Sequence, residues 1–144
     1  MLITIACKKE HKNDEYTQEE YNTIEDFMNS QLKVFDRELL NIEVLQINQI
    51  TTSNVDSIKK NIKETTFLMA NLDRTKGQPT DSILKIYNSL LGVSLINNDK
   101  PIGKLIFVKV TALPPTKIEE IGYFPIPLNK RNNIPADLHD LLYD

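Results

Sequence analysis

Apolar residues recur along this chain with two different periods, and the period changes near residue 92. Between residues 18 and 36 they return every three or four positions, beginning with Tyr21, Ile24 and Met28. This spacing is typical of an amphipathic helix with one buried stripe. The preceding run Thr17-Gln18-Glu19-Glu20 fits a capping box, so we predict that the helix begins at Gln18.

A strand and two further helices are predicted before the period changes. Residues 42–50 are rich in β-branched types, which favours a strand. A second helix is expected from Val55 to a stop at Gly77 and Pro79. A third, shorter helix follows Asp81 and ends at Gly92.

The second half of the chain has the alternation of β-strands. A short strand is expected at 93–96 and the strongest one at 104–113, where apolar residues fall on both faces. Two buried faces indicate a central strand or one covered by a helix layer. A further strand within 117–127 is confined to a sheet edge by Pro125 and Pro127, and a short helix follows Pro135.

The order of these elements predicts one α+β domain over residues 17–144. Helices mixed with one strand are followed by a run of strands, which favours a small antiparallel sheet with helices packed on one face. The chain length of 144 residues fits a single domain of this kind.

Composition lowers the prior for some classes of function. The net charge is −3 and the isoelectric point is about 5.4, whereas nucleic-acid-binding domains usually carry a basic surplus, so we expect no nucleic-acid partner. No run of about 18 apolar residues is present, so no membrane-spanning helix is predicted.

Motifs that carry chemistry are absent from the sequence. It has no G-x-S-x-G elbow and no phosphate loop, and its two histidines, His11 and His139, lack metal-ligand spacing. His139 has Asp137 and Asp140 beside it, but neighbours at this spacing on a helix point apart. We therefore expect no catalytic, cofactor-binding or metal-binding residue, and a protein that is not an enzyme. A small enzyme whose site is assembled from scattered polar residues is the weakest alternative.

One stretch stands out as a candidate partner surface. In "GYFPIP", two aromatic residues, Tyr123 and Phe124, stand beside Pro125 and Pro127. An edge strand with exposed aromatics and prolines would present a sticky surface to another protein. Packing within the core is the alternative.

The chain begins "MLITIACKKEHKNDE", a short apolar run that ends at the only cysteine, Cys7. Residues 8–16 are nearly all charged or polar and carry no apolar periodicity, as expected of a flexible tether. Thr4-Ile5-Ala6-Cys7 resembles the lipobox of bacterial lipoproteins, in which a small residue precedes an invariant cysteine. Ala6 matches that pattern; Thr4 departs from the usual leucine.

The resemblance implies that residues 1–7 are the remnant of a signal peptide and its lipobox. Cys7 would then carry a diacylglyceryl group, usually with a further acyl chain such as palmitate on its amine. Because the apolar run is shorter than the 7–15 residues of a complete signal peptide, further sequence upstream of Met1 is expected.

The other reading makes "LITIAC" the first β-strand of a soluble protein, with Cys7 as a small buried hydrophobe. A reactive thiol at Cys7 is a third and weaker reading. Charge directly after the cysteine favours the tether over the strand.

The expected function is therefore that of a cell-envelope lipoprotein. It is anchored to a membrane through Cys7 and has a non-catalytic binding or accessory role. The alternative is a cytoplasmic interaction protein of the immunity or regulatory type, with residues 1–7 as a strand.

Overall fold

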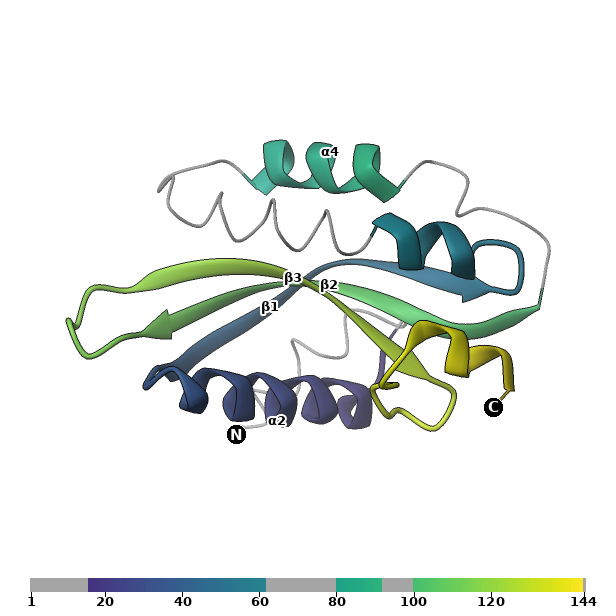
Figure 1. Cartoon of the computed structure of the whole chain (residues 1–144). Helices are drawn as coiled ribbons and strands as arrows, with labels where there is room; N and C mark the ends of the chain where they lie inside the picture. Colours follow the sequence, from purple (N-terminus) through teal and green to yellow (C-terminus); the bar gives the residue numbers. More distant parts are fainter. Residues whose placement is uncertain (1–15, 62–79, 92–99, 144) are drawn as a thin grey trace, which may run out of the picture.

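The computed structural model describes residues 16–61, 80–91 and 100–143 (Figure 1). Along the chain these form helix α2 (Gln18–Val34), strand β1 (Glu38–Thr51), a helical segment at 55–61 and helix α4 (Thr80–Leu91). They continue as strands β2 (Pro101–Leu113) and β3 (Glu120–Asn129) and the 3₁₀ helix η1 (Leu138–Tyr143).

The three strands form one antiparallel sheet in the order β1-β2-β3. The central strand β2 pairs along its length with both neighbours, so Val108 lies between Val44 of β1 and Phe124 of β3. Extra residues interrupt the register of β1 between Leu39 and Asn41 and between Val44 and Gln46. Such bulges bend and twist a strand, and they matter for its outer edge.

Helix α2 covers one face of the sheet, the lower face in Figure 1. Its first turn is closed by the predicted capping box, in which the Glu20 N–H donates to Thr17 Oγ1 at 3.1 Å and the Thr17 N–H donates to Glu20 Oε1 at 2.8 Å. Ile24 and Met28 are buried against the sheet. The lower core consists of Ile24, Met28, Ile42, Ile106, Val108, Val110, Ile126 and Leu128.

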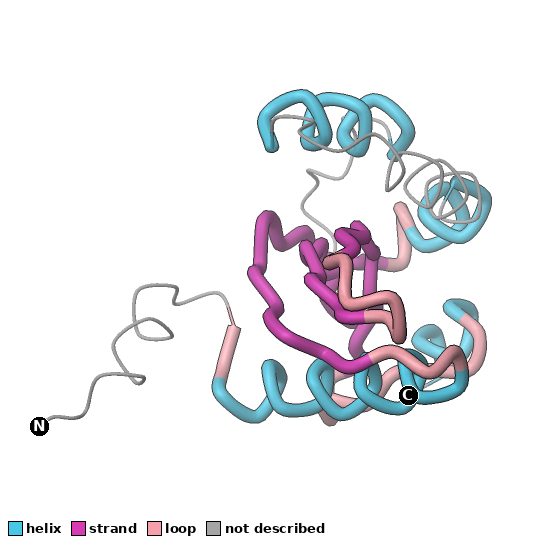
Figure 2. The backbone as a smooth tube through the Cα atoms, turned by 90° about the vertical axis from the view of Figure 1, so that its left-hand side faces the viewer, coloured by secondary structure: helices cyan, strands magenta, loops and turns pink. Residues whose placement is uncertain are grey.

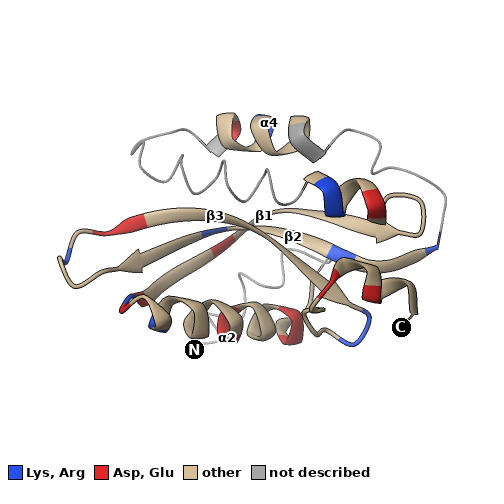
Figure 3. Cartoon of the chain, in the orientation of Figure 1, with Lys and Arg blue, Asp and Glu red and all other residues tan. Residues whose placement is uncertain are grey.

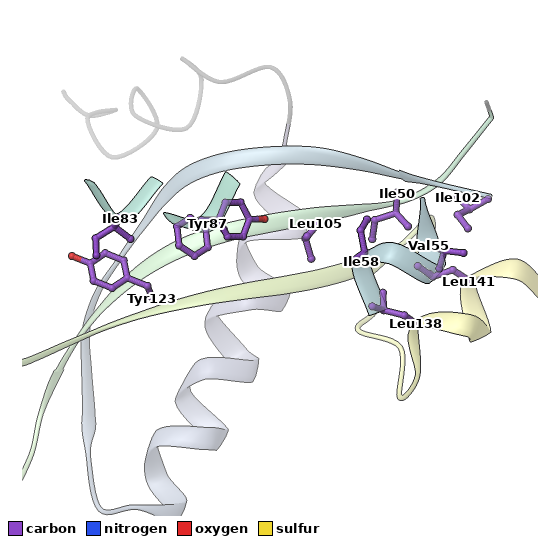
Figure 4. Close-up of a cluster of buried hydrophobic side chains, with 11 residues drawn as sticks. Ile50, Val55, Ile58, Ile83, Tyr87, Ile102, Leu105, Tyr123, Leu138 and Leu141 are labelled. Carbon is purple, nitrogen blue, oxygen red and sulfur yellow. The ribbon is translucent and has the colours of Figure 1, made fainter. Parts of the chain in front are cut away.

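The segment 55–61 and α4 cover the opposite face (Figures 1 and 2). The upper core runs along the sheet, aromatic at one end and aliphatic at the other (Figure 4). Tyr87 of α4 stacks on Phe107 of β2 with ring centroids 3.8 Å apart, and Phe107 lies 6.3 Å from Tyr123 of β3. At the aliphatic end, η1 contributes Leu138 and Leu141.

The α+β class and the antiparallel sheet are confirmed, as are the central position of β2 and the edge position of β3. The placement of the helices differs from the expectation, because they pack on both faces instead of one. The reason is β2: alternate side chains of this strand are buried on opposite faces, and each apolar face needs a cover.

Other differences concern boundaries. Strand β1 begins four residues before the predicted 42–50 strand, and β2 begins three residues before 104. Regular structure near the C-terminus starts at Leu138 and is 3₁₀. The expected strand at 93–96 lies outside the described residues. Within the described part of the chain, no helix is both long and apolar enough to cross a membrane.

Candidate functional site

Cys7, the predicted lipid-attachment residue, lies outside the described residues, as does His11. The described chain starts at Tyr16, which packs beside the lower core with its ring centroid 6.5 Å from that of Tyr21. Tyr16, predicted as the last residue of the tether, is therefore attached to the folded domain. Eight residues, 8–15, separate it from Cys7, and all eight are charged or polar.

The candidate partner surface in β3 is not a single exposed patch. Tyr123 is only 5% exposed and belongs to the upper core, and Pro125 is also buried. Phe124 and Pro127 are half-buried, and Phe124 packs against the lower core. Successive side chains of a strand point to opposite faces, which separates Tyr123 from Phe124. The sequence shows the aromatics but not that helices cover both faces.

A polar cluster joins the C-terminal region to the helical segment 55–61. It consists of Asp56 and Lys59 from that segment, His139 from the start of η1, and Asp137, the residue before η1. Figure 3 shows acidic and basic positions on segment 55–61 and acidic positions at η1, at the same end of the sheet. His139 Nε2 lies 2.6 Å from Asp56 Oδ1, and His139 Nδ1 lies 3.2 Å from Lys59 Nζ.

The chemistry of Lys59 assigns the proton on the histidine ring. An ammonium group only donates hydrogen bonds, so His139 Nδ1 accepts from Lys59 and the ring proton of a neutral His139 sits on Nε2. That N–H then donates to Asp56. The four side chains thus form a chain of alternating donors and acceptors, which explains how a lysine can lie against a histidine.

Asp137 closes the cluster. Its two carboxylate oxygens lie 2.9 and 3.0 Å from Lys59 Nζ, and the backbone N–H of His139 donates to Asp137 Oδ1 at 2.9 Å. The His139 N–H and then the Lys59 ammonium lower the pKa of the Asp137 carboxyl below its ordinary value of 3.8. Both donors stabilise the charged carboxylate.

The exposure of its side chains indicates that the polar cluster is a surface contact between η1 and residues 55–61. The Lys59, Asp137 and His139 side chains are 36%, 49% and 43% exposed, and Asp56 is 83% exposed. Water competes for such groups, so their ion pairs are weak and general acid–base chemistry gains little from them. Across the described residues, no three His, Cys, Asp or Glu side chains converge to hold a metal ion.

Sequence reasoning considered His139 only with Asp137 and Asp140. The structure instead gives it two partners about 80 positions earlier, Asp56 and Lys59. Asp137 contacts the His139 backbone and not its ring. No local signal reveals the long-range pairs, because only the packing of η1 beside residues 55–61 brings them together.

The upper core contains one unusual polar atom. The Tyr87 side chain is fully buried, and its hydroxyl has no hydrogen-bond partner within the part of the chain that the structure describes. Burial raises the pKa of this phenol far above its ordinary value. A buried hydroxyl without a partner costs stability and gives no chemistry by itself.

Comparison with known proteins adds no identification. No protein-family model, no curated protein and no solved structure matches this chain.

Proposed function

We propose that this protein is a lipid-anchored binding or accessory protein of the bacterial cell envelope. The observation that carries the proposal is the succession of Thr4-Ile5-Ala6-Cys7 and eight charged or polar residues before the folded domain. This succession resembles a lipid-attachment cysteine followed by a solvated tether. A tether of eight residues reaches up to about 30 Å, enough to hold a small domain clear of lipid headgroups.

The described domain offers an exposed polar cluster, formed by Asp56, Lys59, Asp137 and His139, that is accessible to a partner. In this proposal the folded residues provide the binding surface, and attachment through Cys7 places that surface at a membrane. Two or three acyl chains on one cysteine give stable anchoring, whereas a single chain would bind only marginally.

The test is acyl labelling of the protein expressed in a bacterial host from its own upstream sequence. Cells are fed an alkyne fatty acid, and the protein is then followed through detergent phase partitioning. We expect label and detergent-phase partitioning for the original chain and loss of both for Cys7→Ala. Thr4→Leu is the matched variant, because it restores the residue usual in a lipobox and should retain or increase the label. Unchanged partitioning of Cys7→Ala would rule the anchor out.

The alternative function is a soluble interaction protein with residues 1–7 as a strand. One observation favours it: β1 lies at an edge of the described sheet, and Tyr16 packs beside Tyr21, whose hydroxyl donates to the Ile42 carbonyl of β1 at 3.4 Å. The N-terminal segment thus enters the domain near an available edge. In the labelling experiment this alternative predicts an unlabelled chain with a free Cys7 thiol.

A further inference from the structure

The two edges of the described sheet differ in their capacity to accept another strand. The outer strand β3 contains Pro125 and Pro127, which lack the N–H that strand pairing needs. Strand β1 is 14 residues long and contains no proline, and residues 44–51 carry no charge. Charges and prolines protect an edge strand, and β1 has neither over residues 44–51; its protection there is the bulge between Val44 and Gln46, which an added strand must match.

Two side chains identify which backbone groups of β1 face outward. The Tyr21 hydroxyl donates to the Ile42 carbonyl at 3.4 Å, and Asn54 Nδ2 donates to the Gln49 carbonyl at 3.1 Å. These carbonyls therefore point away from β2. Backbone groups of an antiparallel strand alternate in direction, so Val44, two residues after Ile42, and Ile47, two before Gln49, also face outward.

The register of β1 agrees with this assignment. An extra residue between Val44 and Gln46 shifts the alternation, which is why the outward residues Val44 and Ile47 are three positions apart instead of two. Tyr21 and Asn54 occupy the edge on either side. The outward N–H and C=O groups of Val44 and Ile47 make no hydrogen bond to any residue that the structure describes.

Side chains define what an added strand must look like. On the α2 face, Val44 and Ile47 are half-buried against the lower core. On the α4 face, β1 presents Leu45, which packs against the upper core, beside the polar side chains of Glu43, Gln46 and Asn48. A strand beside β1 must therefore be apolar on the α2 face and must carry mainly polar side chains, with one apolar position, on the α4 face. It must also offer paired backbone groups three positions apart.

We propose that β1 pairs antiparallel with β1 of a second copy of this chain. A twofold axis between Val44 and Ile47 sets Val44 opposite Ile47 and Leu45 opposite Gln46 of the second copy, and each face of β1 continues into the same face of the second copy. The bulge spacing matches because both strands have it. Glu43 faces Asn48 of the second copy, so like charges do not meet. This inference is independent of the lipid on Cys7.

The window between Tyr21 and Asn54 is short, so the contact is weak. We expect a dimer with a dissociation constant on the order of 10–100 μM, as for small interfaces. The test is sedimentation equilibrium of the full chain, residues 1–144, from about 10 μM to about 1 mM, which brackets the expected dissociation constant. Reductant is present to prevent a Cys7 disulfide.

Three variants separate this pairing from other contacts. Val44→Pro removes one outward N–H and no bond to β2, and Ile47→Lys places charge at the contact; each should weaken dimerisation at least tenfold. Asn48→Lys, by contrast, lies opposite Glu43 of the second copy and should tighten the dimer about two- to fivefold. Far-UV circular dichroism shows whether each variant is folded.

Several results would overturn the pairing. One is a monomer at every concentration up to about 1 mM. Another is a dimer whose affinity is unchanged in Val44→Pro and Ile47→Lys variants that are folded. A third is loss of the dimer in the full chain carrying Ile3→Lys and Ile5→Lys, since the N-terminal segment would then be the occupant of the edge.

Discussion

The two faces of the sheet are covered in different ways, although both are built on the same central strand. The lower face has one helix of 17 residues whose first turn is fully capped and whose core is aliphatic apart from Met28. The upper face is covered by shorter described elements, carries an aromatic stack and buries a hydroxyl without a described partner. Among the described residues, the buried polar side-chain atom without a hydrogen-bond partner belongs to the upper face, which also contains the larger side chains.

This difference shows that the two layers of the fold are stabilised by different kinds of contact. A regular helix on a regular strand pattern needs few special contacts. The upper layer instead is stabilised mainly by a stack of rings, and the exposed polar cluster adds a weak contact between η1 and residues 55–61. Changes on the two faces should therefore differ in size and, in one case, in sign.

The largest expected effect is the loss of the central ring. Phe107→Ala removes the middle of the aromatic stack and should lower the free energy of unfolding by about 3–5 kcal/mol. Its neighbour Ile106 is equally buried but faces α2, and Ile106→Ala should cost about 2–5 kcal/mol. Urea unfolding of both variants measures the comparison. A Phe107→Ala cost below 1 kcal/mol would contradict a packed upper core.

Next in size is a glycine in β2. A Cβ at Gly103 would lie 2.5 Å from the Leu128 backbone carbonyl and 3.3 Å from Leu141 of η1. Gly103→Ala should therefore cost about 1–3 kcal/mol and displace η1. The control is Gly122→Ala, whose Cβ would meet only the Phe124 ring, a half-buried side chain able to turn aside. Equal losses in thermal unfolding would contradict the close approach at Gly103.

An effect of opposite sign is expected at Tyr87. Tyr87→Phe keeps the stack on Phe107 and removes the buried hydroxyl, so the free energy of unfolding should rise by about 1–3 kcal/mol. Tyr21→Phe is the matched variant, since the Tyr21 hydroxyl donates to the Ile42 carbonyl and its removal should bring no gain in stability. Chemical denaturation that shows a loss on Tyr87→Phe would mean that the hydroxyl is satisfied after all.

A smaller loss is expected at the start of α2. Thr17→Ala removes the hydroxyl that accepts from the Glu20 N–H and should cost about 1 kcal/mol. Thr23→Ala is the control, because the hydroxyl of this half-buried residue donates to the Glu19 carbonyl one turn earlier and does not cap the helix. Differential scanning calorimetry with equal midpoints for the two variants would argue against the cap.

The smallest effect concerns pH. Because the folded pKa of Asp137 is lowered, its contribution is complete above the ordinary value of 3.8 and is lost as pH falls through the lower folded value. An NMR titration of the Asp137 carboxyl carbon should show this, and Lys59→Ala should move the midpoint upward. A midpoint unaffected by Lys59→Ala would show that the lysine does not stabilise the Asp137 carboxylate.

The sequence predicted most of the regular fold because α2 and β2 have strong periodic patterns. It also identified the Thr17 cap, since a capping box is local. It did not show that both faces are covered, because periodicity reports a buried face and not the element that buries it. The polar cluster was missed for the same reason: His139 meets Asp56 and Lys59 only through tertiary packing.

The intact mass of the protein, purified from bacterial membranes after expression from its own upstream sequence, tests the central claim most directly. The proposal predicts a chain that starts at Cys7, lacks residues 1–6, and carries the added mass of a diacylglyceryl group with or without a third acyl chain. A chain that retains residues 1–6 together with an unmodified Cys7 thiol would contradict the lipid anchor.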